Sequence, residues 1–597
     1  MPNLRTLACA LVVTLSFTAT AAARDVHSYA EPDKFRHGHI ELDLAVDFDA
    51  KRLIGVASLH IERTERGRSR LLKLDTRDLT IRSVWLNDKR DAPLPFELGA
   101  DDDVLGRELI VHLPKRAGSR FVVNLQYETA PGASGLQWLS ARQTAGGGQP
   151  FLFSQSQAIH ARSWVPLQDT PSVRFTYAAR VVTPPDLLAV MSADNDPDTA
   201  RDGDYRFRMD QPIPSYLLAI AAGNLDFAPI GPRTGIYAEP ELLAAAVAEF
   251  EDTERMLEIG EQLFGPYRWE RYDLLILPPS FPFGGMENPR LSFITPTVLA
   301  GDKSLVGLIA HELAHSWSGN LVTNATWRDL WLNEGFTVFL EARIMEALYG
   351  ERRRRMEERL GYEDLIENFD TLEPEAEVLA IDLEDQDPDL VFSQVPYEKG
   401  RLLLVWLEQA VGREAMTEFL ETYFDEFAFR SITTEDFLSY LDENLLTQTT
   451  AVSLDDVREW VFEPGLPGDA PVPSADVFAP IDAARAGFLA GDLAAADIDA
   501  GDWSTQDWLY FLNNLPETLS ESQLVELDAA FDLTAAGNNE IAHSWLRIAI
   551  RNDYRAAWPR LERYLLGIGR NKLVRPLYTD LMATDDGAAF ARDVFER

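Results

Sequence analysis

The sequence has one cysteine and a large deficit of positive charge. Because Cys9 has no second cysteine to pair with, an internal disulfide and a cysteine-ligated metal site are both excluded. Lys and Arg number 55 against 96 Asp and Glu, which gives a net charge of −41. That balance excludes the basic footprint of a nucleic-acid-binding protein and argues against binding to an anionic membrane surface. We interpret the charge as a soluble, self-repelling surface.

Long apolar runs are also missing, apart from a short one near the N-terminus that is typical of a signal peptide. Arg5 supplies a positive charge, residues 7–17 are apolar, and residues 21–23 are small alanines suited to cleavage before Arg24. An uncleaved anchor is the alternative, disfavoured because the apolar run is too short to span a bilayer. We therefore expect an exported protein, periplasmic or secreted, with no membrane association once the signal peptide is removed.

One segment combines the residue types that bind a catalytic metal ion. His311-Glu312-Leu-Ala-His315 follows an apolar run with helical spacing, so its histidines at i and i+4 project from one helix face. Glu334, in a second predicted helix, completes a set of two imidazoles and one carboxylate that leaves one zinc position open. Glu312 points into the same cleft, where it can take a proton from a metal-bound water. The sequence predicts a zinc hydrolase with one Zn²⁺ per chain.

Changes in hydrophobic pattern divide the chain into segments. Apolar and polar residues alternate from about residue 36 to 224, as in β-strands, whereas helical spacing dominates beyond Pro240. A Pro- and Gly-rich segment at 464–473 is typical of a linker. Helices are predicted at 242–264, 331–349, 400–412, 414–427, 434–445 and 453–462, with a strand at 272–277. The expected organisation is a multidomain α+β protein: signal peptide 1–23, all-β domain 24–224, zinc catalytic domain 225–465, linker 466–480 and all-α, solenoid-like domain 481–597.

Further motifs give the sequence a family resemblance. Residues 278–289 (PPSFPFGGMENP), the segment Trp331-Leu-Asn-Glu-Gly335 and the segment Val395-Pro-Tyr-Glu-Lys-Gly400 join the zinc motif in resembling the M1 family of zinc aminopeptidases. The segments 155–160 (QSQAIH), 168–173 (QDTPSV) and 569–576 (GRNKLVRP) are similar to the leukotriene A4 hydrolase branch of that family. The likeness covers nearly the whole mature chain and implies a thermolysin-like mixed α/β fold for the catalytic domain.

The resemblance implies roles for residues around the metal. Glu287 would bind the free α-amino group of a peptide, which limits cleavage to the first residue, and Gln157 would join it from the β domain. Gly284, Gly285 and Met286 of the same motif would line the bound substrate. Tyr397 would donate a hydrogen bond to the oxyanion of the tetrahedral intermediate.

Three further residues are implied at the two ends of the substrate. Arg570 and Lys572 would receive the carboxylate of a short peptide. Asp389 matches an acid at the inner end of the pocket, where it could bind an arginine or lysine side chain at the first residue. Phe283 and Phe392 stand where the branch usually has tyrosine, so ring shape is kept and two hydroxyls are lost.

We predict a zinc aminopeptidase that removes the first residue of short peptides with a free N-terminus, with Glu312 as general base. One alternative is a bifunctional enzyme that also hydrolyses a lipid epoxide, with Asp389 directing the water. Another is a zinc-stabilised scaffold or peptide-binding protein, disfavoured because structural zinc needs neither Glu312 nor Tyr397. The sequence does not define the oligomeric state, and we expect a monomer.

Overall fold

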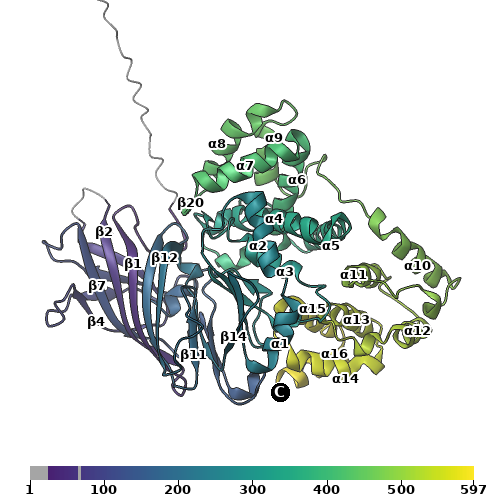
Figure 1. The fold of residues 1–597 in the computed structure, drawn as a ribbon, viewed down its shortest axis with the longest axis horizontal. Helices are drawn as coiled ribbons and strands as arrows, with labels where there is room; N and C mark the ends of the chain where they lie inside the picture. Colours follow the sequence, from purple (N-terminus) through teal and green to yellow (C-terminus); the bar gives the residue numbers. More distant parts are fainter. Residues whose placement is uncertain (1–23, 65–68) are drawn as a thin grey trace, which may run out of the picture.

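The computed structural model describes residues 24–64 and 69–597 (Figure 1). The predicted signal peptide lies outside the described residues. The chain folds as a β-sheet domain, then a mixed α/β domain that holds the zinc motif, then a helical domain, which confirms the predicted order. Among the described residues, no helix is both long and apolar enough to cross a membrane.

The first domain consists of β-sheets with few helical turns. Its strands are β1 (Phe35–Asp47), β2 (Arg52–Arg63), β3 (Leu71–Thr76), β4 (Thr80–Leu86), β5 (Phe96–Leu98), β6 (Arg107–His112), β7 (Arg120–Glu128), β8 (Leu136–Leu139), β9 (Phe151–Ser154), β10 (Arg174–Val182), β11 (Leu188–Met191), β12 (Asp204–Pro214) and β13 (Ile220–Gly223). The largest sheet has the order β12-β10-β1-β2-β7-β4, and smaller sheets run β11-β13-β9-β8 and β3-β6-β5. The predicted alternation is confirmed, because inward residues of β1 and β7 are buried and the residues between them are not.

A β-bulge interrupts the pairing of β1 with β2. His37 lies opposite Ile61 and His39 lies opposite His60, so Gly38 is the extra residue between them. The bulge reverses the alternation of the strand. His37 is fully buried in the core, whereas His39 turns to the outer face of the sheet.

The catalytic domain places a small sheet against a group of helices. Its strands are β14 (Asp226–Pro229), β15 (Thr234–Ala238), β16 (Tyr272–Ile276), β17 (Gly285–Met286), β18 (Leu291–Ile294), β19 (Val322–Asn324) and β20 (Arg430–Ile432), and its helices are α1 (Pro240–Glu249), α2 (Thr253–Phe264), α3 (Gly307–Ala314), α4 (Trp331–Tyr349), α5 (Glu351–Phe369), α6 (Gly400–Val411), α7 (Arg413–Glu426), α8 (Thr434–Asn444) and α9 (Leu454–Phe462). The sheet order β14-β15-β16-β18-β17 leaves β17 at one edge. That edge strand carries two residues of the Gly-Gly-Met-Glu-Asn segment into the site.

The structure corrects the predicted helix over 242–264, which is two helices. The amide of Phe250 bonds to the carbonyl of Ala246 and closes α1, and the Thr253 hydroxyl donates to the Phe250 carbonyl at 2.7 Å. That side-chain bond offers the backbone an alternative to continuing the helix. The predicted helices at 331–349 and 453–462 match α4 and α9, and Ser453 caps α9 as expected.

Helix α5 was not predicted, because its sequence is mostly charged. Arginine–glutamate pairs four residues apart run along it, and these stabilise a helix with a narrow apolar face. Its buried Met356 packs with the core of the C-terminal domain, and its buried Leu365 packs with the main core. Helix α5 therefore joins the catalytic domain to the helical domain.

Helices α4 and α6 cross at a contact between two glycines. A Cβ on Gly335 would lie 2.7 Å from the Cα of Gly400, so neither position has room for a side chain. Close backbone approach brings Glu334, on α4, near Tyr397, which precedes α6. Val338 of α4 lines the cavity described below.

The C-terminal domain is helical, as predicted. Its helices are α10 (Ala479–Ala490), α11 (Thr505–Asn513), α12 (Glu521–Phe531), α13 (Asn539–Arg551), α14 (Trp558–Gly567), α15 (Asn571–Leu581) and α16 (Asp585–Phe595). Helix α10 starts inside the segment predicted as a linker. Two apolar clusters, one around Trp545 and one around Leu577, form the cores of this domain.

Candidate active site

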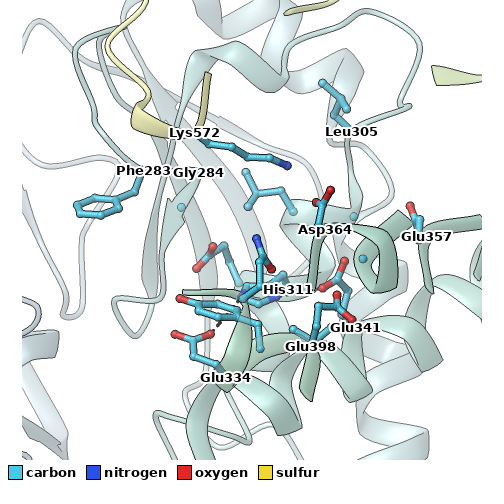
Figure 2. A pocket seen from close by; sticks show the side chains of 18 of the residues that line it. Phe283, Gly284, Leu305, His311, Glu334, Glu341, Glu357, Asp364, Glu398 and Lys572 are labelled. Atoms are coloured by element: carbon cyan, nitrogen blue, oxygen red, sulfur yellow. Dashed lines mark hydrogen bonds and ion pairs between the residues drawn. The ribbon is translucent and has the colours of Figure 1, made fainter. Parts of the chain in front are cut away.

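A cavity of about 690 Å³ lies where the three domains meet (Figure 2). The β domain contributes Gln157, the catalytic domain contributes the zinc motif, and the helical domain contributes Arg570 and Lys572. The volume lies within the usual range for small-molecule sites and suits a short peptide. The structure thus brings together predicted residues that are far apart in the sequence.

The three predicted metal ligands form a compact triangle. His311 Nε2 lies 3.2 Å from His315 Nε2 and 3.4 Å from Glu334 Oε2, and His315 Nε2 lies 3.5 Å from Glu334 Oε2. Bonds of about 2.0–2.1 Å to zinc would put neighbouring ligand atoms of a tetrahedron about 3.3–3.4 Å apart. Glu334 Oε2 is buried, and among the described residues it has no hydrogen-bond partner. The donor set fits zinc.

Neighbouring groups orient both imidazoles. His311 Nδ1 lies 3.0 Å from Glu341 Oε2, and His315 Nδ1 lies 3.1 Å from the Ser318 carbonyl and 3.0 Å from Thr337 Oγ1. Acceptors at Nδ1 hold the proton there, which leaves each Nε2 lone pair directed at the triangle. His315 is the C-cap of α3, so both histidines still share one helical face.

Glu312 occupies space that exists because residue 285 is glycine. A Cβ on Gly285 would lie 2.2 Å from Glu312 Oε1, closer than a non-bonded carbon can approach an oxygen. Glu312 is buried, and its Oε2 has no hydrogen-bond partner in the described part of the chain. Burial raises the pKa of Glu312 well above its usual range. A carboxylate in this setting is a suitable general base.

Tyr397 lies on a π-helical turn, Val395–Lys399, directly before α6. Its ring stacks on the His311 ring, with centroids 6.2 Å apart and an interplanar angle of 19°. The extra residue of a π-turn changes which face a side chain presents, and such turns are frequent at functional sites. The turn places the phenol beside two of the metal ligands, since its ring lies on His311 and its hydroxyl interacts with Glu334.

Glu287 lies deep in the cavity wall, 3% exposed. Gln157 Nε2 donates to Glu287 Oε1 at 3.4 Å, and Asn320 Nδ2 donates to the Glu287 carbonyl at 2.7 Å. Burial raises the pKa of Glu287 to about 7. The neighbouring Met286 accepts a hydrogen bond from Gln155 at its sulfur, which fixes the edge strand that carries it.

Asp389 has partners for both oxygens. Ala158 N donates to Oδ1 at 3.3 Å, and Oδ2 lies 3.1 Å from His160 Nε2. Burial acts to raise the pKa of Asp389, but the hydrogen bond and charge of His160, the Ala158 amide and Arg77 together outweigh it, so the pKa is lowered. Asp389 therefore lines the cavity as a carboxylate tied to the β domain.

Arg570 and Lys572 share one acidic partner, Glu540. Arg570 Nη1 donates to Glu540 Oε1 at 2.9 Å, and Lys572 Nζ lies 3.9 Å from Glu540 Oε2. Arg570 is 9% exposed, whereas the Lys572 side chain is 59% exposed. Two cations and one carboxylate leave one positive charge available to a substrate anion. Gly284 leaves the space that Arg570 Nη2 occupies.

Sequence reasoning missed three supporting residues. Glu341 lies two helical turns after Glu334, so the periodicity of α4 could have identified it as a partner for the metal site. Periodicity identified neither of the other two, because His160 meets Asp389 across a domain boundary and Glu540 meets Arg570 from a different helix of the C-terminal domain.

Fold and site together define a zinc metallopeptidase. Residues 33–217 match the peptidase M1 N-terminal domain, residues 248–460 match the peptidase family M1 domain, and residues 503–597 match the C-terminal domain of leukotriene A4 hydrolase. The chain belongs to the peptidase M1 family and carries the C-terminal domain of the leukotriene A4 hydrolases.

Similar proteins cover almost the whole chain. Leukotriene A-4 hydrolase of Xenopus laevis is 42% identical over 93% of this chain and 93% of its own. Leucine aminopeptidase 2 of Yarrowia lipolytica is 36% identical over 96% of this chain and 91% of its own. The structure of yeast leukotriene A4 hydrolase with bestatin superposes with a TM-score of 0.89 at 33% identity, covering 97% of this chain and 95% of that one. The predicted family and branch are confirmed.

Proposed function

We propose that this zinc peptidase is an aminopeptidase that removes the first residue of short peptides with a free N-terminus. The observation that carries the proposal is the position of Glu287. One carboxylate oxygen of Glu287, one of Glu312 and one imidazole nitrogen of His315 lie within 4.8 Å of one another. A buried acid this close to the metal ligands leaves room for an ammonium group and little more, so only the first peptide bond reaches the metal.

The chain's own residues supply the remaining steps. Zinc held by the triangle would polarise the scissile carbonyl and lower the pKa of water. Glu312 takes the proton of the attacking water and passes it to the leaving amine. Tyr397 donates a hydrogen bond to the oxygen that becomes negative. Glu287 and Gln157 hold the α-amino group, which keeps the reacting atoms aligned.

The other end of the cavity supports a preference for short substrates. Arg570 and Lys572 provide charge-assisted donors for a carboxylate, and both form ion pairs with Glu540. A di- or tripeptide would satisfy both ends at once. We propose that the enzyme acts as a monomer, since one chain supplies every residue of the site.

Hydrolysis of tripeptides, with and without N-terminal acetylation, tests the proposal. Cleavage of the free peptides, loss of cleavage on acetylation and recovery of activity when zinc is returned after chelation would support it. Cleavage of acetylated peptides at a comparable rate would contradict the role of Glu287.

A second candidate function is hydrolysis of a lipid epoxide, favoured by the likeness to leukotriene A4 hydrolase. Three features weigh against it. Phe283 and Phe392 line the cavity without hydroxyls, and both oxygens of Asp389 are already paired. Product analysis after incubation with an epoxide fatty acid decides the matter: a diol that requires Asp389 would establish the second activity.

We also propose that residues 1–23 direct export. The single positive charge, the short apolar run and the small residues before Arg24 support this. Mass spectrometry of the protein recovered outside the cytoplasm is expected to give an N-terminus at Arg24. Recovery of the full-length chain from the cytoplasm alone would contradict it.

A further inference from the structure

A group of metal-binding side chains lies on the outer face of the large sheet, far from the active site. Ligand atoms of His39, Glu41 and His60 all lie within 4.8 Å of one another. His39 and Glu41 are on β1, and His60 is on the paired strand β2 directly opposite His39. His60 Nε2 lies 3.0 Å from Glu41 Oε1. Two imidazoles and one carboxylate form the same donor set as the catalytic triangle.

The bulge at Gly38 is what creates this group. If Gly38 took part in the regular alternation of the strand, His39 would share the inward face with His37. With it, His39 faces outward beside Glu41 and opposite His60. Bulges that re-aim one side chain are common beside functional sites.

The two imidazoles have the arrangement of a ligand pair. Their ring centroids are 5.0 Å apart with an interplanar angle of 85°, against 4.8 Å and 84° for His311 and His315. His39 Nδ1 lies 2.7 Å from Thr176 Oγ1 on the neighbouring strand β10. That contact occupies one ring nitrogen and leaves Nε2 for a metal, as the partners of His311 and His315 do.

Charges around the group leave room for a cation. Three arginines lie nearby: Arg120 pairs with Glu62 at 3.1 Å, Arg208 pairs with Asp210 at 2.5 Å, and Arg36 lines the same depression opposite Glu62. Glu41 is 58% exposed and His60 is 41% exposed, so an ion can reach both from solvent.

A simple histidine–carboxylate ion pair is the competing explanation, and the same domain offers one for comparison. His112 Nε2 lies 2.9 Å from Glu97 Oε1, also exposed and also on adjacent strands. No second histidine accompanies that pair among the groups of possible ligands in the described residues. The two sites differ in the one feature that a metal requires, a third donor.

We propose that His39, Glu41 and His60 form a second metal site, which binds a divalent transition ion such as zinc. Imidazole and carboxylate donors suit zinc, nickel and copper, and three protein ligands leave the remaining positions to water. The rigid sheet fixes the donors before the metal arrives, so binding needs no rearrangement of the backbone.

The test measures zinc bound to the full-length chain. Protein stripped with a chelator and equilibrated with buffered Zn²⁺ is expected to bind two zinc ions per chain by mass spectrometry of the metal. His60→Ala is expected to bind one, and the matched control His112→Ala is expected to bind two. Thr176→Val, which removes the partner of His39, is expected to weaken the second zinc by about 10-fold or more.

Each outcome decides the proposal. Wild-type protein that binds one zinc overturns it, as does His60→Ala protein that still binds two. Equal loss in His60→Ala and His112→Ala would mean unspecific surface binding and also overturns it. Tripeptide hydrolysis is measured in parallel and is expected to be the same in both variants and wild type. A second zinc in a chain that hydrolyses no peptide would contradict the proposed aminopeptidase and leave this site standing.

Discussion

At the scale of single residues, Glu312 is the group whose removal separates metal binding from chemistry. Glu312→Gln keeps the side-chain volume and leaves His311, His315 and Glu334 in place. Loss of the proton acceptor is expected to lower kcat by about 10²–10⁴. Metal analysis should still find zinc at the catalytic site. Substantial residual turnover in this variant would contradict the role of Glu312.

Glu341→Gln is the matched control, because it changes a carboxylate that touches a ligand and not the substrate. It is expected to weaken zinc affinity by about 10–100-fold, while turnover at saturating zinc changes less than in Glu312→Gln. If Glu312→Gln instead weakened zinc binding and Glu341→Gln abolished turnover at saturating zinc, Glu341 would be the general base and Glu312 the partner of the metal ligand.

The pKa of Glu287 predicts how peptide binding depends on pH. Burial raises it to about 7, so the carboxylate becomes neutral below pH 7 and no longer attracts an ammonium group. A peptide α-amino group, with an ordinary pKa of about 7.7–8.0, loses its charge at higher pH. Affinity is therefore expected to be highest between about pH 7 and 8 and to fall on both sides.

Calorimetric titration of the Glu312→Gln variant with a tripeptide measures this binding without hydrolysis and without titration of Glu312. Adding Glu287→Gln is expected to weaken binding and to abolish the fall in affinity on the acidic side. If affinity still falls at low pH in the double variant, a group other than Glu287 causes that fall.

At the scale of elements, the crossing of α4 and α6 sets the distance between a metal ligand and the phenol of Tyr397. Gly335→Ala would push the helices apart, since its Cβ would meet the Cα of Gly400 at 2.7 Å. Overpacking of this kind costs about 1–3 kcal/mol of stability, and kcat is expected to fall as well. Gly567→Ala, with open space around the new methyl group, serves as control. Denaturant unfolding and tripeptide turnover are measured on both; equal stability and activity would mean that the crossing tolerates a side chain.

Elements with a clear apolar periodicity were predicted well, and those set by side-chain bonds or by strand pairing were not. The metal ligands and Glu312 follow from helix periodicity, and the capping box at Ser453 marks the start of α9. Tyr397 and Glu287 were identified from the family motifs and not from hydrophobic periodicity or capping patterns. The break between α1 and α2, the charged helix α5 and the bulge at Gly38 escaped prediction. Each of these is set by tertiary pairing or by side-chain bonds that periodicity does not reveal.

At the scale of the whole molecule, the helical domain completes a site that the catalytic domain begins. Arg570→Gln is expected to raise KM for a tripeptide with a free carboxylate by roughly 10–100-fold, the value of a lost charge-assisted hydrogen bond. KM for the corresponding tripeptide amide should change little. Arg563→Gln, on the exposed side of α14, is the control. Equal effects on acid and amide would mean that Arg570 acts on the fold and not on the substrate.

The division of the site among three domains also has a consequence for timing. The ribosome adds about 5–20 residues per second, so the last metal ligand, Glu334, is made well before Arg570. A growing chain that has folded its metal centre still lacks the wall that receives the end of a peptide. We expect such a chain, or one cut by a protease before α15, to bind zinc without selecting short peptides. Only a chain whose translation is complete would then have full activity.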